Sequence, residues 1–240
     1  MDFDLSPEQL DVAKMCREFG EAEIAPHAER WDAQAEFPLD TVKQLGELGL
    51  LGLPFPEKYG GSGADTVTYA LAVMEIGRAD ASVGITMAAH VSLGAMPFYL
   101  FGTEEQKLKY LVPLARGEKL WAFGLTEPQA GSDAGATQTK AELKDGQWSI
   151  NGTKCFITNA GTPISGGVTI TAVSGSGDAK RPEISNIIVP QETPGYSHAK
   201  PYKKMGWRAS DTRELKFDNA VVPEENLLGP RGRGLKQFLD

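Results

Sequence analysis

A polar loop in the middle of the chain carries residue types that suit phosphate binding. Residues 121–125 are apolar and are predicted to form a strand, and the loop follows at residues 126–133. Its proline lacks a backbone donor and Gly131 permits unusual dihedral angles, so the loop can turn several N–H groups toward one point. Thr126 and Ser132 add hydroxyls at its two ends. From these residues alone, an ordinary turn is an equally good interpretation.

A second segment, residues 155–158, is mostly apolar and is predicted to be a strand. Apolar runs of this length usually belong to the core of a sheet, and that is the simplest interpretation of Phe156 and Ile157. Thr126 and Thr158 are, on the same reasoning, ordinary strand threonines.

Both segments resemble the two flavin-site signatures of the acyl-CoA dehydrogenase family. The matching stretches are Phe123-Gly-Leu-Thr-Glu-Pro-Gln-Ala-Gly-Ser-Asp133 and Asn151-Gly-Thr-Lys-Cys-Phe-Ile-Thr-Asn-Ala-Gly161. The resemblance continues at residues 204–212 and 222–229, and residues 54–63 near the front also match. It therefore covers essentially the whole chain.

The resemblance implies that an acyl-CoA thioester is oxidised to the trans-2-enoyl-CoA. The cofactor would be FAD, a carboxylate base would take the α-proton, and an electron-transferring flavoprotein would accept the electrons. In the family the base is a Glu of a C-terminal helical domain, and neither of its two positions falls within these 240 residues. The counterpart of Glu127 in the family is structural. We therefore expect residues 1–240 alone to be inactive and to hold flavin weakly or not at all.

The resemblance also assigns contacts to the flavin. Phe123, Leu125 and Thr126 would lie along the ring, and Gly131 and Ser132 would approach the phosphate and ribityl region. Ser132 would also touch the pantetheine arm of CoA. Phe156, Ile157 and Thr158 would form a second wall, where many family members carry Trp in place of Phe156.

Contacts to the substrate are expected from two further places. The helix that carries Met87, His90, Leu93 and Gly94 lies beside the acyl pocket in the family, although a buried histidine is more often a satisfied core residue than a ligand. Lys180 and Arg181, in a loop after the predicted strand 168–174, would meet the phosphates or adenine of CoA. A solvated charge pair is at least as good an interpretation of these two residues.

Other functions on the same fold remain open. An acyl-CoA oxidase or a flavin-dependent monooxygenase would share these motifs, and a non-catalytic module that binds acyl-CoA or a partner protein would also fit. By resemblance, the native assembly is a homotetramer of a cytoplasmic, bacterial-type enzyme.

Composition limits the alternatives. The chain is 41% hydrophobic and 23% charged, which is typical of a globular protein, and its net charge of -8 argues against a nucleic-acid or anionic-membrane partner. Cys16 and Cys155 lack metal-ligand spacing and are expected to be reduced, buried residues of a cytoplasmic protein. The N-terminal residues resemble neither a secretory signal nor a transit peptide. Residues 81–101 carry no Asp, Glu, Lys or Arg, but they include polar residues, so we expect a helix surrounded by protein.

The first part of the chain is predicted to be all helical. Ser6 and Gln9 form a capping-box pattern before a first helix, in which Pro26 must end or kink the chain. Further helices are expected at residues 39–48, from residue 65, at 81–101, and from a second capping box at 103–106 to about 117. The helix from residue 65 would carry Val67, Leu71 and Met74 on one stripe. This makes about five helices in all.

After residue 119 the apolar period changes to two. Asp145-Gly146 is the sequence of a type I′ hairpin, which pairs Leu143 with Trp148 and Ala141 with Ile150. Further strands are expected at 155–158, 168–174, 184–189, 199–204 and 213–222. The predicted fold class is α+β: a helical bundle at residues 1–118, an antiparallel β-sheet or barrel at 119–228, and the start of a truncated helical domain at 229–240.

Overall fold

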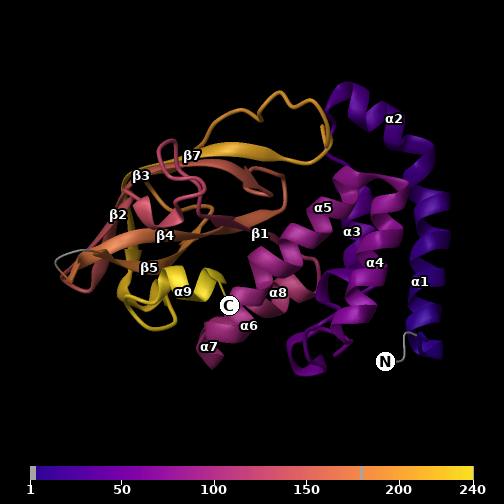
Figure 1. Cartoon of the computed structure of the whole chain (residues 1–240), viewed down its shortest axis with the longest axis horizontal. Coiled ribbons are helices and arrows are strands. Elements are labelled where there is room, and N and C mark those ends of the chain that lie inside the picture. Colours follow the sequence, from indigo (N-terminus) through magenta and orange to yellow (C-terminus); the bar gives the residue numbers. More distant parts are fainter. Residues whose placement is uncertain (1–3, 179–180, 240) are drawn as a thin grey trace.

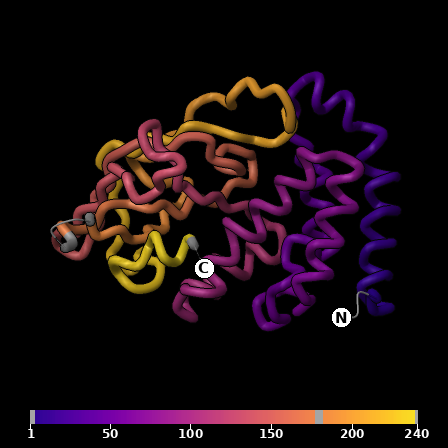
Figure 2. Tube along the Cα trace, in the orientation of Figure 1, coloured from indigo at the N-terminus to yellow at the C-terminus, as the bar shows by residue number. Residues whose placement is uncertain are grey.

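The computed structural model describes residues 4–178 and 181–239, which form a helical layer and a β-sheet layer side by side (Figure 1). The helices of the helical layer end at Ala115, and the first strand, β1 (Leu120–Gly124), begins after a short turn. The chain trace in Figure 2 shows the segment between β6 (Tyr196–His198) and β7 (Thr212–Pro223) reaching back over the helices. There Arg208 donates its backbone N–H to Asp32 at 3.3 Å, so this segment joins the sheet to the helix at residues 25–34.

The first helix begins as its sequence predicts. In α1 (Pro7–Phe19), the Gln9 N–H donates to the Ser6 hydroxyl and the Ser6 N–H donates to the Gln9 side chain, which completes the capping box. The helix does not end at Pro26. A π-helical turn, η1 (Gly20–Ile24), leads directly into α2 (Ala25–Gln34).

The same arrangement of π turn and proline occurs twice more. The turn η4 (His90–Ala95) precedes Pro97 in α6 (Met96–Phe101), and η5 (Lys107–Leu111) precedes Pro113 in α8 (Val112–Ala115). A proline has no N–H to donate and crowds the carbonyl four residues earlier. The wider π turn removes that conflict, because its hydrogen bonds skip one more residue. Each helix therefore continues through its proline.

The remaining helices follow the predicted positions. They are α3 (Leu39–Glu47), α4 (Thr66–Ala79), α5 (Ala81–Ala89), which continues through η4 into α6, and α7 (Glu104–Gln106), which continues through η5 into α8. The second capping box is present, since the Gln106 N–H donates to Thr103. Between α3 and α4 lie only the 3₁₀ turns η2 (Leu50–Gly52) and η3 (Glu57–Tyr59).

The predicted apolar stripe of α4 was wrong. Val67 and Met74 are 48% and 66% exposed, whereas Thr68, Ala72 and Ile76 are buried. The closest contact of this helix with α5 is made at a glycine, Gly77. A Cβ built on Gly84 of α5 would lie 2.7 Å from the Cα of Gly77. Large side chains on that face would force the helices apart.

Residues 81–101 form the one described helix that is long and apolar enough to cross a membrane by length and composition. In the fold, 56% of its apolar window is buried inside the protein. Its buried side carries Val83, Met87, Val91 and Phe98, which belong to the helical cores.

The sheet contains eight strands in the order β6-β7-β3-β2-β4-β5-β8, with β1 paired to β4. Its other members are β2 (Lys140–Lys144), β3 (Gln147–Thr158), β4 (Ser165–Asp178), β5 (Arg181–Pro190) and β8 (Leu227–Leu228). The hairpin register is confirmed, and both turn residues have positive φ, 52° at Asp145 and 74° at Gly146.

Of the two forms expected for this region, sheet or barrel, the described residues form an open sheet, whose strand order ends at β6 and β8. Three details of the prediction were wrong. The sheet is mixed and not purely antiparallel, because β1 and one residue of β2 pair with β4 in parallel. Residues 155–158 continue β3 instead of forming a separate strand. Residues 199–204 form no strand, and the short β6 lies just before them.

The two layers share their hydrophobic cores at β1. Leu120 belongs to the core of the first helices, and Trp121 packs with Phe98 of α6 and Ile188 of β5 in a second core. Gly94 allows this contact, since a Cβ built there would lie 2.4 Å from the Trp121 carbonyl oxygen. The helical layer is therefore fixed against the strand that leads into the polar loop.

A substitution at Gly94 tests this close approach. We expect Gly94→Ala to lower the free energy of unfolding by about 1–3 kcal/mol, because the methyl group must displace the β1 backbone. Gly77→Ala is the matched control: a Cβ there meets nothing within 4 Å, and the helix gains up to about 1 kcal/mol in propensity. Denaturant unfolding of both variants measures the difference, and equal stability would contradict the packing argument.

Candidate functional site

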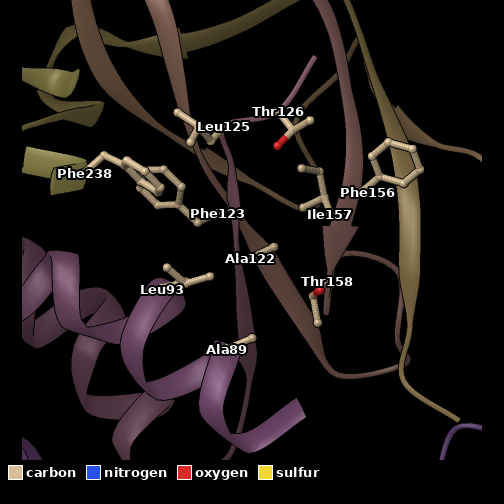
Figure 3. A pocket seen from close by; sticks show the side chains of 10 residues that line it. All are labelled: Ala89, Leu93, Ala122, Phe123, Leu125, Thr126, Phe156, Ile157, Thr158 and Phe238. Atoms are coloured by element: carbon tan, nitrogen blue, oxygen red, sulfur yellow. The ribbon is translucent and has the colours of Figure 1, made fainter. Parts of the chain in front are cut away.

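A mostly apolar pocket lies where β1, the end of β3 and the long helix meet (Figure 3). Its lining residues are Ala89, Leu93, Ala122, Phe123, Leu125, Thr126, Phe156, Ile157, Thr158 and Phe238. The last of these comes from α9 (Gly234–Leu239), the predicted C-terminal helical turn. The pocket holds about 170 Å³, less than the roughly 300–1,000 Å³ of a typical ligand site. It is an open hollow in the side of the sheet.

The pocket brings together residues from both signature segments. Phe123, Leu125 and Thr126 come from β1 and the loop after it, and Phe156, Ile157 and Thr158 come from the end of β3. The Cys155 N–H donates to the Thr126 carbonyl at 2.8 Å, which holds the loop against β3. Six of the eight residues that the sequence assigns to the cofactor therefore line one hollow.

Gly131 and Ser132 do not line this pocket. Both are exposed at the far end of the loop, and the loop does not use the freedom that Gly131 offers, because the φ of Gly131 is outside the positive region. The loop closes instead through paired backbone hydrogen bonds between Glu127 and Ala130, at 2.9 and 3.1 Å. A Cβ on Gly131 would meet no protein atom within 4 Å, which leaves its outer side open.

Phe156 is held in a conformation that an aromatic residue rarely adopts. Its φ is 59°, and the pairing of β3 with β7 shifts register between Lys154 and Ile157, which marks a β-bulge. A non-glycine residue in the left-handed region costs of order 1–3 kcal/mol. The bulge leaves the Phe156 ring 64% exposed while Ile157 is buried. Phe156 is thus not a core residue of the strand, unlike the simplest sequence interpretation.

A buried ion pair lies beneath the polar loop. The Lys154 ammonium donates to the Glu127 carboxylate at 2.7 Å, and the two side chains are 0% and 1% exposed. Lys154 also donates to the Leu125 carbonyl at 3.1 Å and to the hydroxyls of Thr137 and Thr171 at 3.2 and 3.1 Å. The pair therefore connects both signature segments.

The carboxylate of Glu127 is fully used by the protein. The Thr137 hydroxyl donates to it, as do the N–H groups of Gln138 at 2.7 Å and Thr139 at 3.1 Å. Burial by itself would raise the pKa of Glu127, but the Lys154 ammonium and these donors lower it to about 2. Burial lowers the pKa of Lys154 to about 8, against the opposing effect of the Glu127 charge. Both groups are charged at pH 7, and neither faces the pocket.

Of the expected substrate residues on the long helix, only Leu93 lines the pocket. His90 is fully buried: its Nε2 donates to the Leu114 carbonyl at 3.1 Å, and its Nδ1 accepts from the Trp121 N–H at 3.3 Å. Burial lowers the pKa of His90 to about 4, so the ring is neutral at pH 7. This is the geometry of a core histidine. Gly94 serves the contact with β1, and Met87 is buried in the helical core.

Of the two basic residues expected to meet CoA, the structure describes only the backbone of Arg181. Arg181 is the first residue of β5 and pairs with Asp178, so it begins a strand and not a loop. Lys180 and the side chain of Arg181 lie outside the described part of the structure. Their contact with CoA stays a prediction.

Several residues of the site were missed from the sequence. Ala89 and Ala122 line the pocket through small side chains, and Phe238 reaches it from α9, where its ring centroid lies 5.6 Å from that of Phe123. Lys154 lies inside the second signature segment, directly before the apolar residues of the strand. A lysine at that position could have indicated a buried charge that needs a partner. No local pattern predicts the position of Phe238, because its ring partner, Phe123, lies about half the chain length away in the sequence.

The pattern of this site and fold has known counterparts. Residues 6–118 match the sequence profile of the acyl-CoA dehydrogenase N-terminal domain, and residues 122–220 match that of the middle domain. A probable acyl-CoA dehydrogenase of Bacillus subtilis is 54% identical over 239 residues, which cover 100% of this chain and 62% of that protein. The chain belongs to the acyl-CoA dehydrogenase family.

Solved structures agree with this membership. A chain from the structure described as the electron transferring flavoprotein of Acidaminococcus fermentans is 43% identical with a TM-score of 0.95, and the match covers 100% of this chain and 62% of that one. An acyl-CoA dehydrogenase from Bacillus anthracis complexed with FAD is 40% identical with a TM-score of 0.90, covering 98% and 40%. The chain spans about 62% of the length of the Bacillus subtilis relative. Acyl-CoA dehydrogenases are oxidoreductases.

The residues of the acyl-CoA dehydrogenase pocket fit a flavin. The strained backbone of Phe156 presents an exposed aromatic ring beside an apolar hollow, where a flat ring system can pack. The hydroxyls of Thr126 and Thr158 border the same hollow and can hydrogen-bond to the polar edge of such a ring.

The buried pair is expected to behave as one unit. Lys154→Met leaves the Glu127 carboxylate buried and unpaired, and Glu127→Gln leaves the ammonium unpaired, so each should cost about 3–5 kcal/mol of unfolding free energy. The double variant should recover much of that loss, because it leaves neither charge uncompensated. Denaturant unfolding measures the cycle, with Glu18→Gln as a control, since its contact with Lys14 is exposed and should be worth little. Additive losses would contradict the coupling.

Acidification should weaken the same pair. The pKa of Glu127 is about 2 in the folded protein against 4.5 for the free side chain. Its contribution is therefore complete above about pH 4.5 and is lost as the pH falls toward 2. We expect the stability difference between the wild type and Glu127→Gln to shrink over this range in denaturant titrations at fixed pH. A difference that stays constant from pH 5 to pH 2 would show that Glu127 does not have this lowered pKa.

Proposed function

We propose that the protein containing this chain is a FAD-dependent acyl-CoA dehydrogenase that oxidises acyl-CoA thioesters to trans-2-enoyl-CoA. The supporting observation is the convergence of Thr126, Phe156 and Thr158 on one apolar hollow. They come from two segments about thirty residues apart in the sequence. A site for a planar cofactor needs walls of this kind, and a simple turn and a simple core strand would not supply them.

FAD, when bound, supplies the acceptor for the hydride that leaves the β-carbon. The residues of this chain would do the positioning. Phe156 and Ile157 would pack against the ring, while the Thr126 and Thr158 hydroxyls would orient its polar edge and stabilise charge that develops there. Leu93, Phe123 and Phe238 would keep water away from the reacting carbons. Gly131, with open space on its outer side, would allow the phosphate region to approach the loop.

The base that removes the α-proton is proposed to lie outside residues 1–240. Among the described residues, no Asp or Glu lines the pocket, and the nearest carboxylate along the sequence, Glu127, is buried and ionised against Lys154. A carboxylate with a pKa of about 2 is also a weak base. Glu127 is therefore assigned to the scaffold of the loop.

Partners and setting are proposed on the family resemblance. An electron-transferring flavoprotein would take the electrons, and the structural relative named for such a flavoprotein supports this choice. The whole protein would be a cytoplasmic homotetramer. An acyl-CoA oxidase or a flavin-dependent monooxygenase of the same fold is the second candidate, since the hollow itself does not distinguish oxygen from a protein acceptor.

Activity measurements on two lengths of the protein test this proposal. We expect the full-length protein to carry FAD and to reduce an artificial electron acceptor with acyl-CoA, and residues 1–240 alone to show no turnover and little bound flavin absorbance. Thr158→Val in the full-length protein should reduce turnover with little loss of stability, since it removes only the hydroxyl. Robust turnover by residues 1–240 would place the base within this chain. Oxygen consumption without an added acceptor would favour the oxidase or monooxygenase.

A further inference from the structure

The exposed ring of Phe156 lies against a second aromatic ring that is not part of the pocket lining. The ring centroids of Phe156 and Tyr202 are 5.0 Å apart, and the ring planes are inclined at 34°. Aromatic pairs at this distance attract each other beyond the area they bury. In Figure 3, Phe156 lies on the opposite side of β3 from Phe123 and Phe238, next to the strand β7. Tyr202 therefore supports the ring from outside the pocket.

The backbone of Tyr202 is fixed to the strand that also holds β3. Its N–H donates to the Thr212 carbonyl at 3.0 Å, and Thr212 is the first residue of β7 and the pairing partner of Thr158. The Lys204 ammonium closes the segment by donating to the Ser210 carbonyl at 2.6 Å and to the Thr212 hydroxyl at 2.8 Å. One residue, Thr212, thus sets the positions of both Tyr202 and the end of β3.

The phenol of Tyr202 reaches the bulge itself. Burial, together with the neighbouring Cys155 and Glu214, raises the pKa of Tyr202, and the Phe156 backbone has the opposite effect on this pKa. The Tyr202 side chain therefore contacts Phe156 through its ring, and its phenol lies near Cys155, the residue before Phe156. These contacts come from a segment without regular secondary structure, at the place where the sequence predicted a strand.

We propose that Tyr202 is a positioning residue for the pocket: it holds the Phe156 ring, and with it the bulge at the end of β3, in the orientation that the cofactor requires. The inference rests on the proposed function, because it assigns the Phe156 ring to the flavin. A ring that is 64% exposed on a left-handed backbone has few other contacts to fix it. Removing Tyr202 frees the bulge to relax toward an ordinary extended strand.

The test compares Tyr202→Leu with Tyr202→Phe in the full-length protein. FAD is titrated into the apoprotein, and Phe156 is observed by ¹⁹F NMR after fluorophenylalanine labelling, with its signal assigned by its loss in Phe156→Leu. We expect Tyr202→Leu to weaken FAD binding about 3- to 10-fold and to shift the Phe156 signal, while Tyr202→Phe, which keeps the ring, stays within about twofold of wild type. Combining Tyr202→Leu with Phe156→Leu should add no further loss of affinity beyond Phe156→Leu alone.

Tyr196→Leu is the matched control for losing a tyrosine ring from the same sheet edge. Its ring stacks on Phe217 at 5.2 Å, and it should lower thermal stability without moving either the FAD affinity or the Phe156 signal. An unchanged Phe156 signal in Tyr202→Leu would overturn the inference, whatever the flavin does. So would an unchanged FAD affinity in that variant. A wild-type protein that binds no FAD would instead overturn the proposed function, and the NMR signal would still report whether Tyr202 fixes Phe156.

Discussion

The ion pair between Glu127 and Lys154 is the interaction on which the geometry of the site depends. Lys154 belongs to β3, Glu127 to the loop after β1, and the donors to Glu127 come from residues 137–139 ahead of β2. A buried pair of this kind does not by itself make a protein more stable, because each charge loses its hydration. Its value lies in specificity, since a different arrangement of these segments would leave a charge buried without a partner. The loop after β1 and the end of β3, which form the pocket walls, are therefore held in position by the ion pair that is buried beneath them.

The helical layer reaches the sheet by a different means, which is close packing. Gly94 lets the long helix touch the β1 backbone, and small residues on α4 and α5 let those helices lie against each other. The π turns before Pro26, Pro97 and Pro113 keep these helices continuous. One of those turns, η4, carries His90 and Leu93, so the same irregular turn joins β1 on one side and lines the pocket on the other.

The features that neighbouring residues decide could be predicted from the sequence. The features that depend on contacts between distant segments could not. The capping boxes and the Asp145-Gly146 hairpin were correct because a few neighbouring residues decide them. The prediction for α4 failed because it looked for large apolar side chains at helical spacing. The closest contact between α4 and α5 is instead made by glycines. Residues 199–204 were expected to form a strand, but they form none, and Lys204 and Tyr202 hydrogen-bond to the start of β7. The mixed character of the sheet comes from the parallel pairing of β1 with β4, two strands more than forty residues apart, which no short pattern encodes.

The same distinction applies within the site. The motif resemblance predicted six lining residues, but it could not show that Phe156 lies on a bulge with positive φ, because a bulge depends on the partner strand. A strained residue persists only where its surroundings determine it from several sides. Here the Lys154 ammonium is buried and fixed two residues before Phe156, and Tyr202 lies against the ring from the other side. The strained backbone of Phe156 is thus held by contacts within the protein on both of its sides.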